Sequence, residues 1–243
     1  MNTKPMRPTT DDRGTGRIEA FSDGVIAVAI TLLILDVHVP SVQTGLLPAL
    51  LREWPTYLGY VTSFLVITIF WANHHNMFRY IQQVDYPLLV INSFFLMCIA
   101  FIPFVTAVLT QYIASPTEQH TAAIVYGATL LLNGILFNSI WWYAMWKRRL
   151  VRSDLDAPAV QRITKGYLFG LPFWALAIVL SLINVELSLA FFILIDLIYF
   201  LPIRFLRSGR PDIFSLGAQE APEGHLPHTH AKNELPKAAR EPE

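Results

Sequence analysis

Six long apolar segments, separated by short polar stretches, occupy most of this chain. A helix needs roughly 20 mostly apolar residues to cross the hydrocarbon core of a lipid bilayer. The sequence therefore predicts an all-α, polytopic membrane protein with six transmembrane helices per subunit. We expect these helices at residues 18–38, 50–72, 86–112, 120–146, 167–184 and 187–206.

The composition agrees with a membrane protein and argues against other classes. Hydrophobic residues make up 53% of the chain and charged residues only 15%, whereas soluble domains carry roughly 25% charged residues. The 18 basic and 18 acidic residues cancel, which argues against a nucleic-acid partner held by bulk charge. The single cysteine, Cys98, excludes an intrachain disulfide and any Cys-x-x-Cys motif. We expect neither a soluble enzyme nor a bound cofactor.

The distribution of basic residues predicts how the chain is oriented. Every Lys and Arg except Arg52 precedes the first segment, lies between segments two and three or four and five, or lies at the end of the sixth segment (Arg204) or after it. Loops rich in Lys and Arg face the cytoplasm, so both termini are expected there. We divide the chain into a cytoplasmic segment (1–16), a six-helix membrane domain (17–208) and a cytoplasmic tail (209–243).

The tail contains several prolines among charged residues, a composition that predicts disorder. It also carries His225, His228 and His230, which are potential metal ligands. Nothing in the sequence fixes a coordination geometry for them, so we predict no metal site.

The first segment begins with an unusual group of ionisable residues. Arg17, Glu19 and Asp23 lie within seven residues of one another. Charges near a membrane boundary are costly unless they pair or face water, so they are candidates for a functional site. Arg17 could instead extend to the lipid headgroups, and Glu19 could interact with the helix dipole. Asp23 lies deeper, where these alternatives are weaker.

Helical geometry separates two faces of this segment. At about 100° per residue, Val28, Leu32 and Leu35 share one face, with Thr31 beside them. Asp23 lies nearly opposite Val28 and should point toward other helices of its own subunit. From periodicity alone, the apolar stripe indicates ordinary packing or lipid contact.

Polar partners for Asp23 occur at the same depth in two other segments. The second segment ends with Asn73–His75, and the third carries Asn92. The adjacent histidines suggest a metal site or a proton relay, but neighbouring helical residues point about 100° apart. A structural polar network, which must be fully hydrogen-bonded inside a membrane, is therefore favoured. Its predicted members are Arg17, Asp23, Trp71, Asn73, His74, His75 and Asn92.

Two further carboxylates have no partner visible in the sequence. Asp36 lies at the outer end of the first segment, where several copies around a pore would attract cations. A single solvated carboxylate is the simpler interpretation. Asp196 stands alone in an apolar run and requires a partner or a wet cavity.

The sequence Arg17-Ile18-Glu19-Ala20-Phe21-Ser22-Asp23 fits the RxxxFSD signature of the transmembrane protein 175 family, the lysosomal and endosomal potassium channels and their bacterial relatives. The resemblance continues through residues 24–35, through 71–75, and through Asn92 and residues 101–104. It implies a passive, potassium-permeable cation channel that has no re-entrant pore loop. Because the signature occurs once, the resemblance implies a bacterial homotetramer in the lipid of the inner membrane.

The same resemblance implies roles for the stripe on the first helix. In this family that helix lines the pore, so Val28, Leu32 and Leu35 would form apolar rings. Such rings close a pore by dewetting, and Thr31 would add a layer of hydroxyl groups. Relatives commonly have Ile or Leu at the position of Val28, so its smaller side chain would widen the constriction. The expected permeant ions are potassium and other monovalent cations. The resemblance also implies an interhelical polar network that supports the pore rather than lining it, formed by Arg17, Ser22, Asp23, Trp71, His74, His75 and Asn92.

The alternative function is a proton-coupled or cation secondary transporter that uses Asp23 and the His74/His75 pair. Transporters of that kind usually contain an internal repeat and broken helices, and neither is visible in this sequence. An intramembrane hydrolase using Ser22 is disfavoured, because Ser22 lacks a Gly-x-Ser-x-Gly context.

Overall fold

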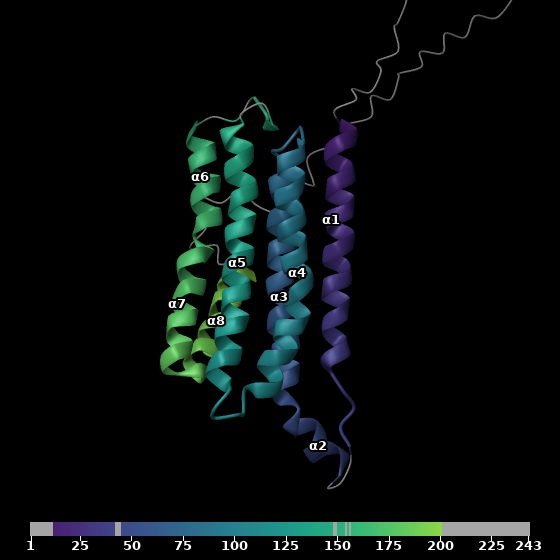
Figure 1. Ribbon diagram of the computed structural model, residues 1–243, viewed down its shortest axis with the longest axis vertical. Helices are drawn as coiled ribbons and strands as arrows, with labels where there is room; N and C mark the ends of the chain where they lie inside the picture. Colours follow the sequence, from purple (N-terminus) through teal and green to yellow (C-terminus); the bar gives the residue numbers. More distant parts are fainter. Residues whose placement is uncertain (1–11, 42–44, 148–149, 154, 156, 201–243) are drawn as a thin grey trace, which may run out of the picture. The chain divides into compact units, whose positions relative to one another are not determined.

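The computed structural model describes residues 12–41, 45–147, 150–153, 155 and 157–200. Regular structure in these residues is helical apart from one isolated antiparallel bridge, and Figure 1 shows the long helices running lengthwise beside one another. The all-α class is thus confirmed for the described residues. The helices are α1 (Asp12–Leu32), the 3₁₀ helix η1 (Leu33–Asp36), α2 (Leu46–Arg52), α3 (Trp54–Phe78), α4 (Tyr86–Tyr112), α5 (Gln119–Trp146), α6 (Ala157–Leu168), α7 (Gly170–Ile183) and α8 (Val185–Phe200).

The described helices provide five segments long and apolar enough to cross a membrane. Helix α8 is also apolar, but its described part ends after 16 residues. The sixth predicted segment, 187–206, extends past the described residues, and so does the predicted disordered tail. The number six therefore stays a prediction. The five segments are Thr15–Asp36, Trp54–Phe78, Tyr86–Tyr112, Gln119–Trp146 and Val160–Ile183.

Three helices differ by several residues from their predicted bounds. The first segment was predicted to begin at residue 18, but α1 begins at Asp12. The second segment was predicted at 50–72, but α3 begins at Trp54 and continues to Phe78. Its polar end stays helical because the side chains find hydrogen-bond partners on neighbouring helices, which a hydropathy pattern does not register. The fifth segment was predicted to begin at residue 167, whereas α6 begins at Ala157. Helix α6 is amphipathic, and its exposed basic residues lower the mean hydropathy of the segment. A hydropathy pattern therefore does not detect its apolar face.

A proline explains why α6 and α7 are separate helices. Pro172 has no N–H to donate to the carbonyl of Leu168, and its ring would clash with that carbonyl in a continuous helix. Helix α6 ends at Leu168 and α7 begins at Gly170. Between α7 and α8, only Asn184 lies outside a helix. A short connection was predicted there, between the segments 167–184 and 187–206.

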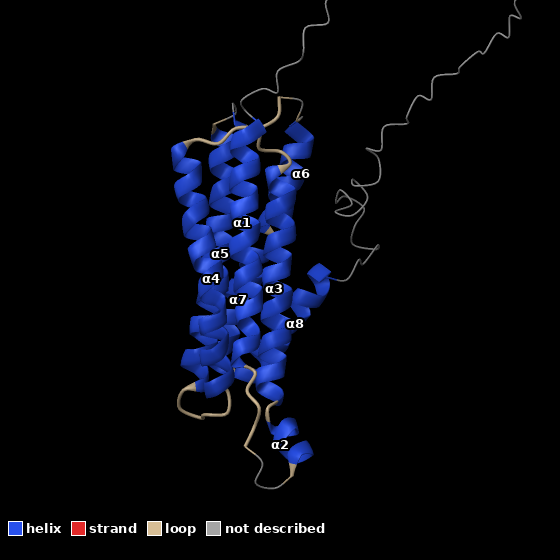
Figure 2. Ribbon diagram, turned by 90° about the vertical axis from the view of Figure 1, so that its right-hand side faces the viewer, coloured by secondary structure: helices blue, strands red, loops and turns tan. Residues whose placement is uncertain are grey.

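Helix α1 lies at the edge of the bundle, where it packs against α3 and α4 (Figure 1). Helix α4 also packs against α5, and α7 packs against both α5 and α8. Figure 2 shows the same helices from the side, with the short α2 beyond their ends. Side chains from α3, α4 and α5 form the centre of the core, among them Ile67, Phe95, Ile99, Ile102 and Leu130.

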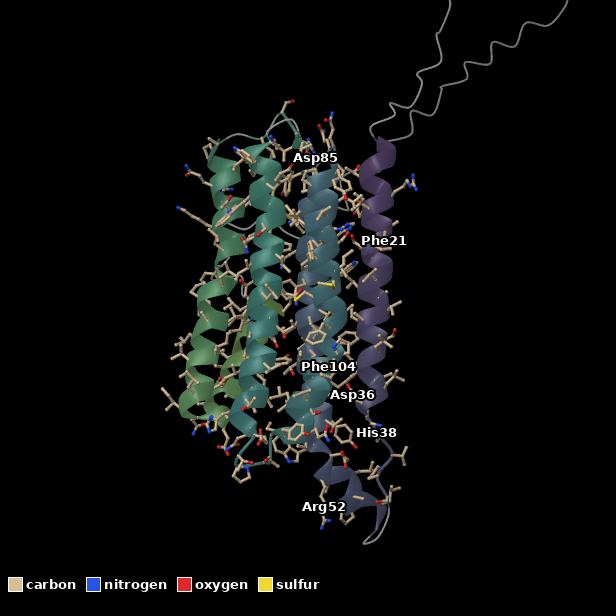
Figure 3. The ribbon with its side chains drawn as sticks, viewed as in Figure 1. Phe21, Asp36, His38, Arg52, Asp85 and Phe104 are labelled. Atoms are coloured by element: carbon tan, nitrogen blue, oxygen red, sulfur yellow. The ribbon has the colours of Figure 1, made fainter. Side chains whose placement is uncertain are left out.

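The two ends of the bundle differ in charge. Asp85 marks the end at which α1 and α4 begin and α3 and α5 finish, and Arg52 lies at the other end (Figure 3). Apart from Arg52, the basic residues of the described ranges lie toward the end marked by Asp85. The positive-inside rule predicts that this end is cytoplasmic.

Candidate functional site

Helix α1 has one face that its own subunit does not cover. Val28 is 57% exposed and Leu35 is 67% exposed, and Leu32 and Thr31 are exposed beside them. All four predicted pore-lining residues thus lie on this uncovered face. The opposite face is buried against α3 and α4. Its buried residues are Ser22, Ile26, Ala29 and Leu33.

The hydroxyl group of Thr31 is oriented by its own helix. Its Oγ1 donates a hydrogen bond to the carbonyl of Val28, one turn earlier, at 2.8 Å. A hydroxyl has one donor and two acceptor lone pairs. Because the proton is directed back to the helix, the lone pairs of Thr31 remain available to a ligand on the uncovered face.

A buried chain of hydrogen bonds ties α1 to both helices behind it. Nδ2 of Asn92 donates to Oγ of Ser22 at 3.0 Å, and Nε2 of His74 lies 2.9 Å from Oδ1 of Asn92. Since the Asn92 oxygen can only accept, the His74 ring carries its proton on Nε2. All three side chains are buried. They join α1, α3 and α4 at a single point.

Two further contacts link α1 to α3. Nε1 of Trp71 donates to Oδ1 of Asp23 at 2.9 Å, and Nδ1 of His75 lies 2.7 Å from Oε1 of Glu19. Glu19 is four residues before Asp23, and His75 is four residues after Trp71. The two helices are antiparallel, so one turn backward on α1 matches one turn forward on α3. The pairs are therefore successive turns of one interface.

The two adjacent histidines contact different helices. His75 bonds to α1, whereas His74 bonds to Asn92 on α4 and stacks on the ring of Phe95 at 5.4 Å. Within the described ranges, no group of three or more His, Cys, Asp and Glu side chains could hold a metal ion. The geometry thus places the pair in two separate contacts rather than one site.

Not every predicted member joins this network. Arg17 is exposed and forms no hydrogen bond or ion pair within the described part of the chain. Asn73, which lies at the same depth, donates to the carbonyl of Ile69 on its own helix at 2.9 Å. Glu19, for which the sequence left open an interaction with the helix dipole, does join the network through His75. The spacing of Glu19 and Asp23 by one turn was the signal that could have predicted it.

At the outer end of α1, Asp36 and His38 lie close together (Figure 3). Nδ1 of His38 is 2.8 Å from the backbone carbonyl of Asp36, which fixes the ring beside the end of η1. The carboxylate of Asp36 is partly exposed. This carboxyl group therefore lies at the end of the uncovered face that is away from Asp85 (Figure 3).

Comparison with known proteins identifies the family. Residues 17–103 match the family described as "Endosomal/lysosomal potassium channel TMEM175". The potassium channel Cha6605_3372 of Chamaesiphon minutus is 44% identical over 178 residues, which cover 72% of this chain and 87% of that protein. The chain belongs to the TMEM175 family. The resemblance carried by the RxxxFSD signature is thereby confirmed.

Other TMEM175 relatives agree with this assignment. The potassium channel B446_29190 of Streptomyces collinus is 40% identical over 187 residues, covering 76% of this chain and 91% of that protein. The crystal structure of a lysosomal potassium-selective channel TMEM175 homolog from Chamaesiphon minutus matches with a TM-score of 0.69 and 39% identity. That match covers 76% of this chain and 95% of the solved chain. These relatives are channels, so the prediction that the protein is not an enzyme is confirmed.

Proposed function

We propose that four copies of this chain form a potassium-permeable channel whose central pore is lined by α1. The observation that carries the proposal is the division of α1 into two faces. One face is fixed to α3 and α4, and the other presents Val28, Thr31, Leu32 and Leu35 without cover from its own subunit. The closely related potassium channels of Chamaesiphon and Streptomyces support potassium as the permeant ion.

In this arrangement, the apolar side chains form the constriction. Four copies of Leu35, Leu32 and Val28 would stack as rings along the pore. A narrow apolar ring makes an entering ion lose water that the wall cannot replace. Potassium is dehydrated more cheaply than sodium, so the ring favours potassium, and the lone pairs of Thr31 offset part of the dehydration.

The hydrogen bonds from α1 to α3 and α4 fix the orientation of α1. Ser22, on the buried face, and Asp23, at its partly exposed margin, hold the helix, so α1 cannot rotate without breaking those hydrogen bonds. Breaking a buried hydrogen bond leaves unpaired groups, each at a cost of about 1–3 kcal/mol. The network therefore keeps the apolar stripe directed at the pore without lining the pore itself.

The proposed setting is the inner membrane of a bacterium, with membrane lipid around the tetramer and both termini in the cytoplasm. Other monovalent cations would also pass, because Val28 gives a wider ring than a larger aliphatic residue. The ring of Asp36 carboxylates would attract cations to the outer mouth of the pore.

The direct test compares potassium and sodium flux in liposomes for the wild type and for Leu35→Ala. Leu182→Ala is the matched control, because Leu182 is 63% exposed but lies on α7, which α1 does not contact. We expect Leu35→Ala to change the flux ratio by roughly tenfold, equivalent to about 1.4 kcal/mol in barrier height. We expect Leu182→Ala to leave the ratio unchanged. Wild-type flux from folded Leu35→Ala would contradict the pore assignment.

The same vesicles separate a channel from a secondary transporter that uses Asp23 and the His74/His75 pair. Passive conduction rises with the ion gradient without saturating at the low concentrations typical of a carrier site. Saturable flux would favour the transporter.

A further inference from the structure

Asp196 is a membrane-domain carboxyl group that the proposed pore does not use. It lies on α8, which packs against α3, α5 and α7 and not against α1. The residue is 3% exposed, and its Oδ2 is buried without a hydrogen bond in the described part of the chain. An unsatisfied buried polar atom is costly. The sequence required a partner for Asp196, and the structure shows where that partner must lie.

The buried face of α8 directs Asp196 toward α5. Phe192, one turn before Asp196, packs edge-on against the ring of Tyr126, with the ring centroids 5.4 Å apart. Asp196 follows Phe192 by one turn and therefore lies on the same face of α8. Tyr126 is itself 2% exposed, so the phenol and the carboxyl group share one buried region.

The phenol oxygen of Tyr126 is the first member of a directed chain of hydroxyl groups. Oγ1 of Thr106 donates to the carbonyl of Ile102 at 2.8 Å, and Oγ of Ser63 is 2.7 Å from Oγ1 of Thr106. Because the Thr106 proton is already committed, Ser63 donates to Thr106. Tyr126, 3.1 Å from Ser63, then donates to Ser63. The lone pairs of the Tyr126 oxygen are left to accept a proton donor.

No cation balances a negative charge on Asp196 among the described residues. Helix α7 contains no ionisable side chain. The face of α3 that meets α8 carries Pro55, Leu58, Gly59 and Thr62, none of which is charged. On α5, Tyr126 packs against the same face of α8 through Phe192, and its hydroxyl proton is already donated to Ser63.

We propose that Asp196 and Tyr126 form a proton-binding site inside each subunit, between α3, α5 and α8. The bound proton resides on the Asp196 carboxyl group, which is then neutral and directs its O–H to the Tyr126 oxygen. The proton reaches water by way of Tyr126, which, unlike Asp196, lines a cavity of about 20 Å³ together with Thr62 and Phe192, among others. A cavity of that size holds about one water molecule.

Binding of this proton couples the packing of α8 to pH. The unfolded chain exposes Asp196 to water, where the carboxyl group ionises, so unfolding at neutral pH releases the proton. Stability contributed by this site therefore falls as the pH rises. An asparagine at this position is neutral at every pH and removes that dependence.

Infrared spectroscopy of the full chain in lipid tests the site without measuring ion flux. A protonated carboxyl group gives a carbonyl band that is separate from the carboxylate bands. We expect this band at neutral pH in the wild type and its loss in Asp196→Asn. Asp36→Asn is the control, because Asp36 is partly exposed, and we expect the band to remain in that variant. If the spectra of the wild type and Asp196→Asn do not differ in this band, the proposal is overturned.

Tyr126→Phe provides a second variant in case Asp196→Asn does not fold. It keeps the aromatic ring against Phe192 and removes only the oxygen that accepts from Asp196. We expect the carboxyl band to remain and to shift to higher frequency, because the O–H has lost its acceptor. An unshifted band overturns the assignment of Tyr126 as the partner.

Discussion

At the scale of single residues, the contacts of Asn92 show why this site needs an amide. Its nitrogen donates to Ser22 and its oxygen accepts from His74, so one side chain satisfies two buried groups of opposite character. Neither a carboxylate nor a hydroxyl group offers that donor and acceptor pair in the same fixed geometry. The residue thus joins three helices through two hydrogen bonds.

Asn92→Ala should destabilise the protein by about 2–4 kcal/mol, since it leaves the buried Ser22 and His74 groups unpaired. Thermal unfolding of the purified protein in detergent measures the effect. Asn73→Ala is the control, because Asn73 bonds only to a carbonyl of its own helix. Equal melting temperatures for the two variants would show that the buried contact contributes little.

At the scale of helices, glycine allows α5 to approach α7 closely. A Cβ atom on Gly134 would lie 2.8 Å from the side chain of Leu171 and would also collide with the ring of Trp174. A Cβ atom on Gly166, in α6, would meet no atom within 4 Å. The contact between α5 and α7 therefore depends on the absence of a side chain at one position.

Gly134→Ala should lower the free energy of unfolding by about 1–3 kcal/mol through overpacking. Gly166→Ala should have no such effect, although both substitutions favour helix formation equally. Melting temperatures in the same detergent compare the two variants. Stability in Gly134→Ala as high as in Gly166→Ala would mean that α7 moves away without cost.

At the scale of the whole molecule, the proposed pore requires several subunits, because each contributes only the uncovered face of its own α1. Four helices around an axis bring the same residue of each copy together, which a monomer or a lipid-facing helix cannot do. The arrangement is therefore tested by the distance between copies of one residue.

Leu35→Cys should form disulfide-linked dimers under mild oxidation in membranes, because the proposed pore brings this position of each copy together. Leu182→Cys, at a similarly exposed position on α7, should not. The native Cys98 is buried and adds no background. Non-reducing electrophoresis detects the product, and cross-linking of Leu182→Cys but not Leu35→Cys would place α7 rather than α1 at the centre.

The sequence by itself determined the features that depend on local pattern. Hydropathy located α4 and α5 to within one residue, and helical spacing placed Val28 and Leu35 on one face and Asp23 on another. These predictions work because each depends on residues within a few turns of one another. Other helix ends were less well predicted, since α3 continues through polar residues whose partners belong to other helices.

Only the tertiary structure decided which partner each polar residue takes. Ser22 and Asn92 are 70 positions apart, and Asp23 and Trp71 are 48 apart. Their contacts depend on the rotation and depth of each helix against its neighbours, which no local pattern specifies. The same reason separates His74 from His75: packing fixes the direction in which each side chain points, and direction selects the partner.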